Sequence, residues 1–292
     1  MGGKVEPLDY TLARCATLVG IGLVAGSAGG LLGIGGAVIL IPALAQVFPD
    51  VEYGLFAATA LVCNVFVGAG GAVGHWRNRR VIPRVVWMII PMGVAAAIAG
   101  VLAANALEQG YTRVLWLVFG LVVCYIVYNN VVRLFQKGGP EALTTGDRLD
   151  PAKVHLAGAA AVALPTGFLS GMLGIGGGVY SVPSQQIFLG MPQKNAIANS
   201  SATMIVFCAI AAVVKNVTVD LPAGFTHWDP LRLAALIIPS AALGAFIGGH
   251  LTHKLPDRLV RGIFLAFLVW TLHKCFFVKG DLPGLIQGWL AM

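Results

Sequence analysis

Residues 29–42 read GGLLGIGGAVILIP, and residues 171–183 repeat the pattern as GMLGIGGGVYSVP. The two copies lie at a constant offset of 141 residues, so that the glycines and proline of the first copy fall on those of the second: Gly33 on Gly174, Gly35 on Gly176, Gly36 on Gly177 and Pro42 on Pro183. This match predicts an internal duplication in which both copies form the same local structure.

The first copy lies inside an apolar run from Leu12 to Phe48. As a single helix this run would be about 55 Å long, nearly twice the hydrocarbon thickness of a bilayer. Clustered glycines disfavour a regular helix and leave backbone groups exposed. We therefore expect a helix over residues 12–28, a break, and a half-helix over residues 36–47.

The composition is that of a membrane protein. Of the 292 residues, 58% are hydrophobic and 11% are charged, and the mean hydropathy is +0.84, whereas soluble domains carry roughly 25% charged residues. At about 20 residues per crossing the apolar segments make about eight long stretches. We predict three parts: a first membrane repeat (1–135), a cytoplasmic linker (136–153) and a second membrane repeat (154–292).

The net charge of +7 does not indicate nucleic acid, because the basic residues lie in short loops without interleaved aromatics. Five single cysteines are scattered through apolar segments and match neither a disulfide framework nor a metal site. We interpret them as packing residues. No metal and no cofactor are predicted.

Basic loops give the orientation of the segments. Residues 54–74 form an apolar segment that ends in HWRNRR at residues 75–80, with Arg84 soon after, and this arginine-rich loop is expected in the cytoplasm. The preceding loop carries Asp50 and Glu52 and is expected outside. Two further segments complete the first half, 85–107 with Pro91 inside it and 114–135; the second half repeats the order over 154–188, 194–214, 231–253 with Pro239, and 259–278.

The arginine and lysine positions agree best with an inverted repeat. If each broken segment enters and returns to the same side, Lys194, Lys254 and Arg258 all face the cytoplasm. The predicted fold class is an all-α polytopic membrane protein whose two halves form an inverted repeat, each half with a Gly-broken helical hairpin plus three transmembrane helices. A parallel repeat of eight simple spans stays open.

Paired breaks in a membrane protein indicate a transport site, because interrupted helices direct backbone N–H groups with partial positive charge at a ligand. We expect a small anion there. The candidate substrate-binding residues are the break glycines and nearby polar side chains: Gly33, Gly35, Gly36, Thr59, Asn64, Gly174, Gly176, Gly177, Gly178, Tyr180, Gln185, Asn199, Ser200 and Ser201. Alternatively, isolated hydroxyls bond to their own helix or join helices.

Charged residues near the segment ends are candidates for a gate or for attracting anions, namely His75, Arg77 and Lys215. Alternatively, such residues extend their charged ends to the membrane surface or set the orientation of the segments in the membrane. Every Asp and Glu lies near an end of a long apolar segment or in a loop. This distribution argues against a metal-cation carrier and favours an anionic or neutral substrate.

The sequence contains little that indicates an enzyme. The GxGG spacing lacks the later glycine, the preceding strand and the acidic ribose partner of a dinucleotide-binding loop. No nucleophile, base and orienting residue occur together. We expect a non-enzyme.

With its two GxLGIGG stretches, each followed by a proline, and AIANSSAT at residues 196–203, the chain resembles the TauE/SafE sulfite exporter family, also called the 4-toluene sulfonate uptake permeases. The resemblance covers nearly the whole chain. It implies a secondary transporter of sulfur-containing anions, such as sulfite or an organosulfonate like sulfoacetate, in a bacterial inner membrane. Ala37 stands where the second copy has Gly178, so the site is expected to be asymmetric.

We expect the substrate to be held at the two breaks near the bilayer midplane and released by alternating access. The expected partners are a small sulfur-containing oxyanion or sulfonate and membrane lipid, and not nucleic acid. The sequence does not decide whether a proton is coupled to transport, whether the protein forms a homodimer, or whether it exports or takes up its substrate. An anion channel is the alternative within transport, and a membrane-bound enzyme or assembly factor the alternative outside it.

Overall fold

The computed structural model describes residues 8, 10–77, 80–135, 154–221, 224–251, 265–266, 268–273 and 275–276. Over these residues the chain is helical and contains no strand. Its labelled helices are α1 (Leu12–Leu32), α2 (Ala37–Val47), α3 (Tyr53–Arg77), α4 (Pro83–Glu108), α5 (Thr112–Phe135), α6 (Leu156–Leu173), α7 (Gly178–Leu189), α8 (Gln193–Thr218) and α9 (Asp229–Leu251). Seven of the helices in this described part are long and apolar enough to cross a membrane, so the expected polytopic all-α class is confirmed.

Two expected features fall beyond these ranges. The proposed linker, residues 136–153, lies outside the described residues, and so does most of the expected segment 259–278, of which residues 268–273 are helical. Both inner prolines behave as expected, since α4 continues through Pro91 and α9 through Pro239.

Both glycine stretches separate a long helix from a short one. Helix α1 ends in Gly33, whose φ of 65° is left-handed and whose N–H donates to Gly29 O. Helix α6 ends in the same way at Gly174, with φ of 73° and an N–H donated to Ser170 O. The following helices α2 and α7 have 11 and 12 residues. At 1.5 Å per residue they are about 16 and 18 Å long, which is too short to cross a bilayer.

The end of α1 differs from the expectation. Helix α1 continues past residue 28 to Leu32, so Gly29 and Gly30 are helical. The reason is the packing of α1 on α9: a Cβ on Gly30 would collide with the carbonyl of Ala245. Glycine is retained there because the two backbones touch, and the helix breaks only where Gly33 adopts a left-handed conformation.

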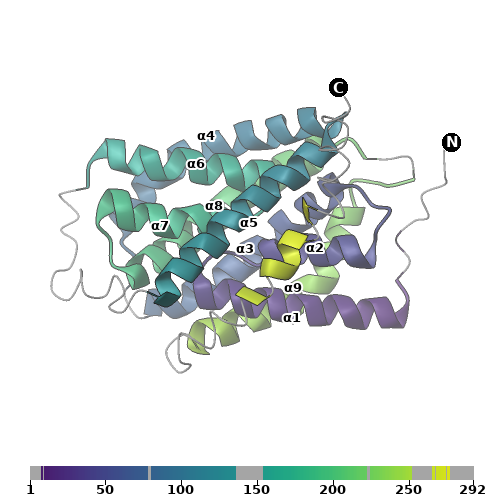
Figure 1. Cartoon of the computed structure of the whole chain (residues 1–292), viewed down its shortest axis with the longest axis horizontal. Coiled ribbons are helices and arrows are strands. Elements are labelled where there is room, and N and C mark those ends of the chain that lie inside the picture. Colours follow the sequence, from purple (N-terminus) through teal and green to yellow (C-terminus); the bar gives the residue numbers. More distant parts are fainter. Residues whose placement is uncertain are drawn as a thin grey trace.

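Small residues allow two helix pairs to pack with their backbones in contact. Helix α1 lies along α9, and α4 lies along α6 (Figure 1). A Cβ on Gly26 would collide with the carbonyl of Ala241 in the first pair, and a Cβ on Gly171 with the carbonyl of Ala97 in the second. Such close approach is the usual basis of helix association in lipid, where apolar burial supplies no driving force.

The helix pairings correspond between the two halves. If α1–α4 are exchanged with α6–α9, the α1–α9 pair becomes the α6–α4 pair, while α3 and α8 pack on each other in the middle. Local contacts correspond as well. Gly36 lies against the Ala25 carbonyl, and Gly177, its counterpart, lies against the carbonyl of Thr166, which is the counterpart of Ala25.

The connections gather at opposite ends of the bundle. Glu52 and Asp220 line the same cavity beside the start of α3. Beyond the other end of α3, the Asn195 side chain donates to Arg80 O at 2.9 Å. Glu52 and Asp220 are therefore neighbours, whereas Arg80 lies beyond the opposite end of α3.

Candidate functional site

The two glycine breaks meet in the middle of the protein. Gly178, the first residue of α7, packs on the carbonyl of Gly33, and a Cβ on it would lie 2.7 Å from the Cα of Ile34. A Cβ on Gly35 would lie 3.0 Å from the carbonyl oxygen of Ile175. The backbone of one break therefore lies directly against the backbone of the other.

Asn64, on α3, joins the two breaks. Its Oδ1 accepts from the N–H of Gly36 at 3.0 Å, and its Nδ2 donates to Gly174 O at 3.3 Å. The side chain is fully buried. The sulfur of Met204 lies near the same glycines, about 3 Å from where Cβ atoms on Gly35 or Gly176 would stand. Larger residues at these glycines would strike Asn64 or Met204.

Helices α2 and α7 both start at this meeting point without a side-chain cap. Their N-cap residues are Gly36 and Gly177, which have no side chain to cap the first turn, and the N–H of Gly36 itself donates to Asn64. The first residues, Ala37 and Gly178, are buried. A buried helix start carries N–H groups and partial positive charge, which favours an anionic ligand.

Among the predicted residues on α8, Ser200 makes a hydrogen bond to a break. Its hydroxyl donates to Gly33 O at 3.3 Å. Ser201 instead donates to Ile197 O on its own helix, and Asn199 accepts from the N–H of Ile82. Thr59, the counterpart of Ser200, donates to Leu55 O on its own helix and to Pro230 O. A substrate contact by these side chains stays a prediction.

The predicted residues on α7 lie beyond the break. Gln185 is fully buried, donates to Ser181 Oγ at 2.8 Å, and has a buried Oε1 without a hydrogen-bond partner among the described residues. Tyr180 is half-buried, with its ring 6.5 Å from that of Tyr125. Both follow Gly178 on a helix that starts at the site, and their contact with a substrate also stays a prediction.

Thr166 is a candidate substrate-binding residue that was not predicted from the sequence. It lies beside Gly177, is 1% exposed, and its hydroxyl has no hydrogen-bond partner within the described chain. In the first half the corresponding residue, Ala25, is apolar. Comparing the two copies position by position would have shown this difference, because a polar residue replaces Ala at one break only.

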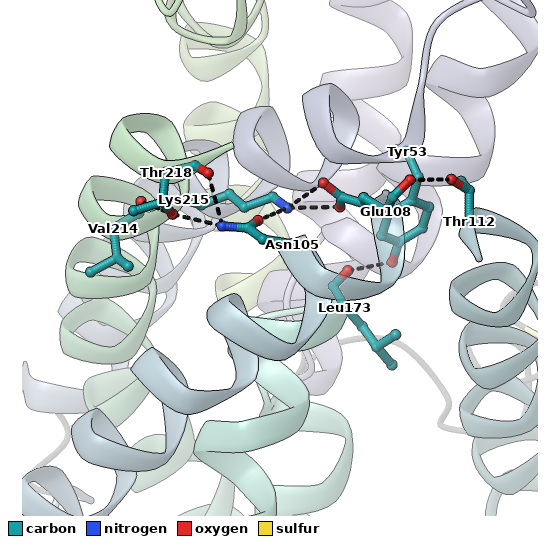
Figure 2. Close-up of polar contacts among 8 residues, drawn as sticks. All are labelled: Tyr53, Asn105, Glu108, Thr112, Leu173, Val214, Lys215 and Thr218. Atoms are coloured by element: carbon teal, nitrogen blue, oxygen red, sulfur yellow. Dashed lines mark hydrogen bonds and ion pairs between the residues drawn. The ribbon is translucent and has the colours of Figure 1, made fainter. Parts of the chain in front are cut away.

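The candidate mouth residues lie at the ends of α3 and α8. His75 is buried near the end of α3, and Arg77 is the last residue of that helix, with its side chain outside the described part. Lys215 is fully buried near the end of α8, where its ammonium contacts Glu108 Oε1 at 2.7 Å (Figure 2). Glu108 was not singled out from the sequence, although it ends an apolar segment as Lys215 does.

A cavity of about 650 Å³ opens beside this ion pair. Its polar lining comes from the loops and helix ends at this end of the bundle and includes Glu52, Glu108, Gln109, Arg113 and Asp220. Gln109 donates to Asp220 at 2.8 Å, which ties the loop after α4 to the loop after α8. The cavity thus lies between the two halves of the chain.

Within the described residues, seven apolar helices of spanning length, together with two short helices that start at a buried, uncharged polar centre, define a multi-pass membrane protein. Residues 18–274 match the family model described as sulfite exporter TauE/SafE. The chain belongs to this family.

Relatives agree with this assignment. The chain is 29% identical to the "Probable membrane transporter protein MamO" of Magnetospirillum gryphiswaldense over 91% of this chain and 45% of that protein. It is 23% identical to the "Probable membrane transporter protein YunE" of Bacillus subtilis over 86% of this chain and 93% of that protein. "Sulfite exporter TauE/SafE family protein 6" of Arabidopsis thaliana is 26% identical over 49% of this chain and 32% of its own length.

The chain spans less than half the length of the MamO proteins it matches. No solved structure matches it. Bacterial relatives named as transporters and the seven apolar helices identify a multi-pass bacterial membrane protein.

Proposed function

We propose that this protein is a secondary transporter of small sulfur-containing anions, sulfite or an organosulfonate such as sulfoacetate, and that it holds its substrate where the two glycine breaks meet. One observation carries the proposal: the two buried breaks, from which α2 and α7 start, lie backbone against backbone, and Asn64 joins Gly36 of the first break to Gly174 of the second. Two helix starts directed at one place supply N–H donors and partial positive charge without a cationic side chain.

The side chains around the breaks suit an oxyanion. Those named above are uncharged and carry amide or hydroxyl groups: Asn64, Thr166 and Ser200. Sulfite and sulfonates present several oxygens as acceptors, and such donors can replace the water around them. The choice of sulfur over other oxyanions rests on the family's description and on the names of the plant relatives.

Alternating access fits the construction from two similar halves. We propose an inverted repeat, residues 1–135 and 154–292, in which the short helices α2 and α7 each return toward the side they came from. Two contacts support it: Glu52 and Asp220 line one cavity, whereas Asn195 bonds Arg80 at the opposite end of α3. A parallel repeat would put the loops of Glu52 and Asp220 on opposite sides. Rocking of one half against the other would open the breaks to either side.

The proposal is tested with purified protein in liposomes. We expect saturable uptake of labelled sulfite or sulfoacetate, and little uptake of sulfate as the comparison anion. Flux that does not saturate and carries single-channel current would identify an anion channel instead. Loss of the substrate without its appearance inside the liposomes would identify an enzyme.

A matched pair of variants tests the site itself. Gly176→Leu should abolish flux, because a Cβ there would lie 2.8 Å from the Met204 sulfur and 2.9 Å from Asn64 Nδ2. Gly20→Leu makes the same substitution at an exposed glycine of α1 that has open space around it, and it should transport normally. Normal flux in Gly176→Leu would contradict a substrate site at the breaks.

A further inference from the structure

The ion pair between Lys215 and Glu108 joins the two halves at a buried place. The Lys215 ammonium donates to both carboxylate oxygens of Glu108, at 2.7 and 2.8 Å, and to Asn105 Oδ1 at 2.6 Å. All three of its protons therefore have acceptors. Lys215 comes from α8, and both of its partners come from α4 (Figure 2).

Glu108 separates Lys215 from the cavity. Its carboxylate lines the 650 Å³ cavity and its side chain is 9% exposed, whereas the Lys215 side chain is 0% exposed and does not line the cavity. A Cβ on Gly54 would lie 2.5 Å from Glu108 Oε2, so the carboxylate also packs on the first turn of α3. Helices α3, α4 and α8 thus close over the ammonium.

A single face of α8 leads from this pair to the glycine breaks. Met204, Cys208, Ala211 and Lys215 follow one another at spacings of four, three and four residues, which places them on the same side of the helix. Met204 touches the breaks, and Cys208 lies 4.0 Å from Ser170, beside Gly177. The other end of this face is Lys215.

Tyr53 makes a second connection between the pair and the breaks. It is buried next to Gly54, and its hydroxyl donates at 2.7 Å to the carbonyl of Leu173, the residue before Gly174 (Figure 2). A movement of α3 relative to Glu108 would therefore also shift the backbone at the second break.

We propose that Glu108 and Lys215 form a gate between the cavity and the glycine breaks, and that the transported oxyanion passes it by replacing the Glu108 carboxylate on the Lys215 ammonium. The inference rests on the proposed function and assigns a second, transient anion site to Lys215 and Asn105. An oxyanion offers the same two or three acceptor oxygens as the carboxylate it replaces, so Lys215 is never left buried without a counter-charge.

The cavity beside the ion pair carries a net negative charge. Glu52 and Asp220 line it with Glu108, against one arginine, Arg113. An oxyanion released from Lys215 enters a net negative space, which favours its departure to bulk water over rebinding. The displaced carboxylate of Glu108 remains in the same water-accessible cavity.

Labelling of Cys208 tests the gate without any transport measurement. We would treat detergent-purified protein with the sulfonate-bearing thiol reagent 2-sulfonatoethyl methanethiosulfonate and follow Cys208 by peptide-resolved mass spectrometry. Labelling should be slow in the unmodified protein and at least fivefold faster in Glu108→Gln, which weakens the pair. The exchange Glu108→Lys with Lys215→Glu should restore slow labelling. Arg232→Gln, which removes an exposed ion pair with Asp229, should change nothing.

The outcomes separate the gate from the proposed function. Wild-type labelling rates in Glu108→Gln would overturn the gate even if the liposomes transport sulfite. Faster labelling together with absent sulfite flux would retain the gate and overturn the proposed substrate. Should Glu108→Gln not purify as a folded protein, the double variant Glu108→Gln with Lys215→Met leaves no unpaired charge and should also label fast; protection in that variant would overturn the gate.

Discussion

The side chain of Asn64 donates to the carbonyl oxygen of Gly174, 110 residues further along the chain, at 3.3 Å. The same amide accepts from Gly36, so one buried side chain holds both breaks together. Because each half of the chain contributes one break, Asn64 couples the local structure of the first half to that of the second.

Asn64→Ala should destabilise the protein and reduce transport. The substitution leaves the Gly36 N–H and one carbonyl buried without this partner, which costs about 1–3 kcal/mol for each unsatisfied group. Thermal unfolding in detergent and flux in liposomes measure the two effects. Asn129→Ala is the control, because the Asn129 side chain donates to the carbonyl of Tyr125 on the same helix at an exposed place. Equal melting temperatures for both variants would argue against the bridging role.

Thr166→Val should weaken substrate binding without destabilising the fold. Its hydroxyl is buried without a partner among the described residues, so replacement by a methyl group removes a polar burial cost of about 1–3 kcal/mol. If the hydroxyl contacts the substrate, KM for sulfite rises about fivefold or more. Thr17→Val, in which the lost hydroxyl bonds Ala13 O on the same helix, serves as the comparison. An unchanged KM with higher stability would assign Thr166 no contact with the substrate.

Gly26→Val should separate α1 from α9. A Cβ at Gly26 collides with the backbone of Ala241, which cannot move as a flexible side chain can. Overpacking of this kind costs about 1–3 kcal/mol or more, and the melting temperature in detergent should fall by several degrees. Gly20→Val on the same helix meets open space and should melt close to the unmodified protein. A fall of the same size in both variants would point to helix propensity alone.

Side-specific labelling should distinguish the inverted from the parallel repeat. Cysteines replacing Glu52 and Asp220 should react with a membrane-impermeant reagent from the same side, because both residues line one cavity. A cysteine replacing Arg80 should react from the opposite side, since Arg80 lies beyond the other end of α3. Labelling of the Glu52 and Asp220 positions from opposite sides would instead support the parallel repeat.

The membrane class and the positions of both breaks could be predicted from local sequence. Left-handed backbone at Gly33 and Gly174 follows from clustered glycine, which alone adopts it without steric cost. The length of the apolar run required an interruption. Gly29 and Gly30 were misassigned by the same argument, because both are packing positions: Gly30 lies against Ala245 of α9, and Gly29 lies against Val67 of α3. The identity of a partner helix is not a local property.

Pairing across the chain was decided by the tertiary structure. Glu108 and Lys215 lie 107 residues apart, and only the packing of α4 on α8 brings the carboxylate to the ammonium. The unpartnered hydroxyl of Thr166 likewise depends on where α6 lies relative to the break. Local sequence determines where a backbone can turn, since φ is limited by each residue's own side chain. Whether a buried polar group then makes a hydrogen bond depends on the distances between helices, and these distances cannot be derived from local sequence.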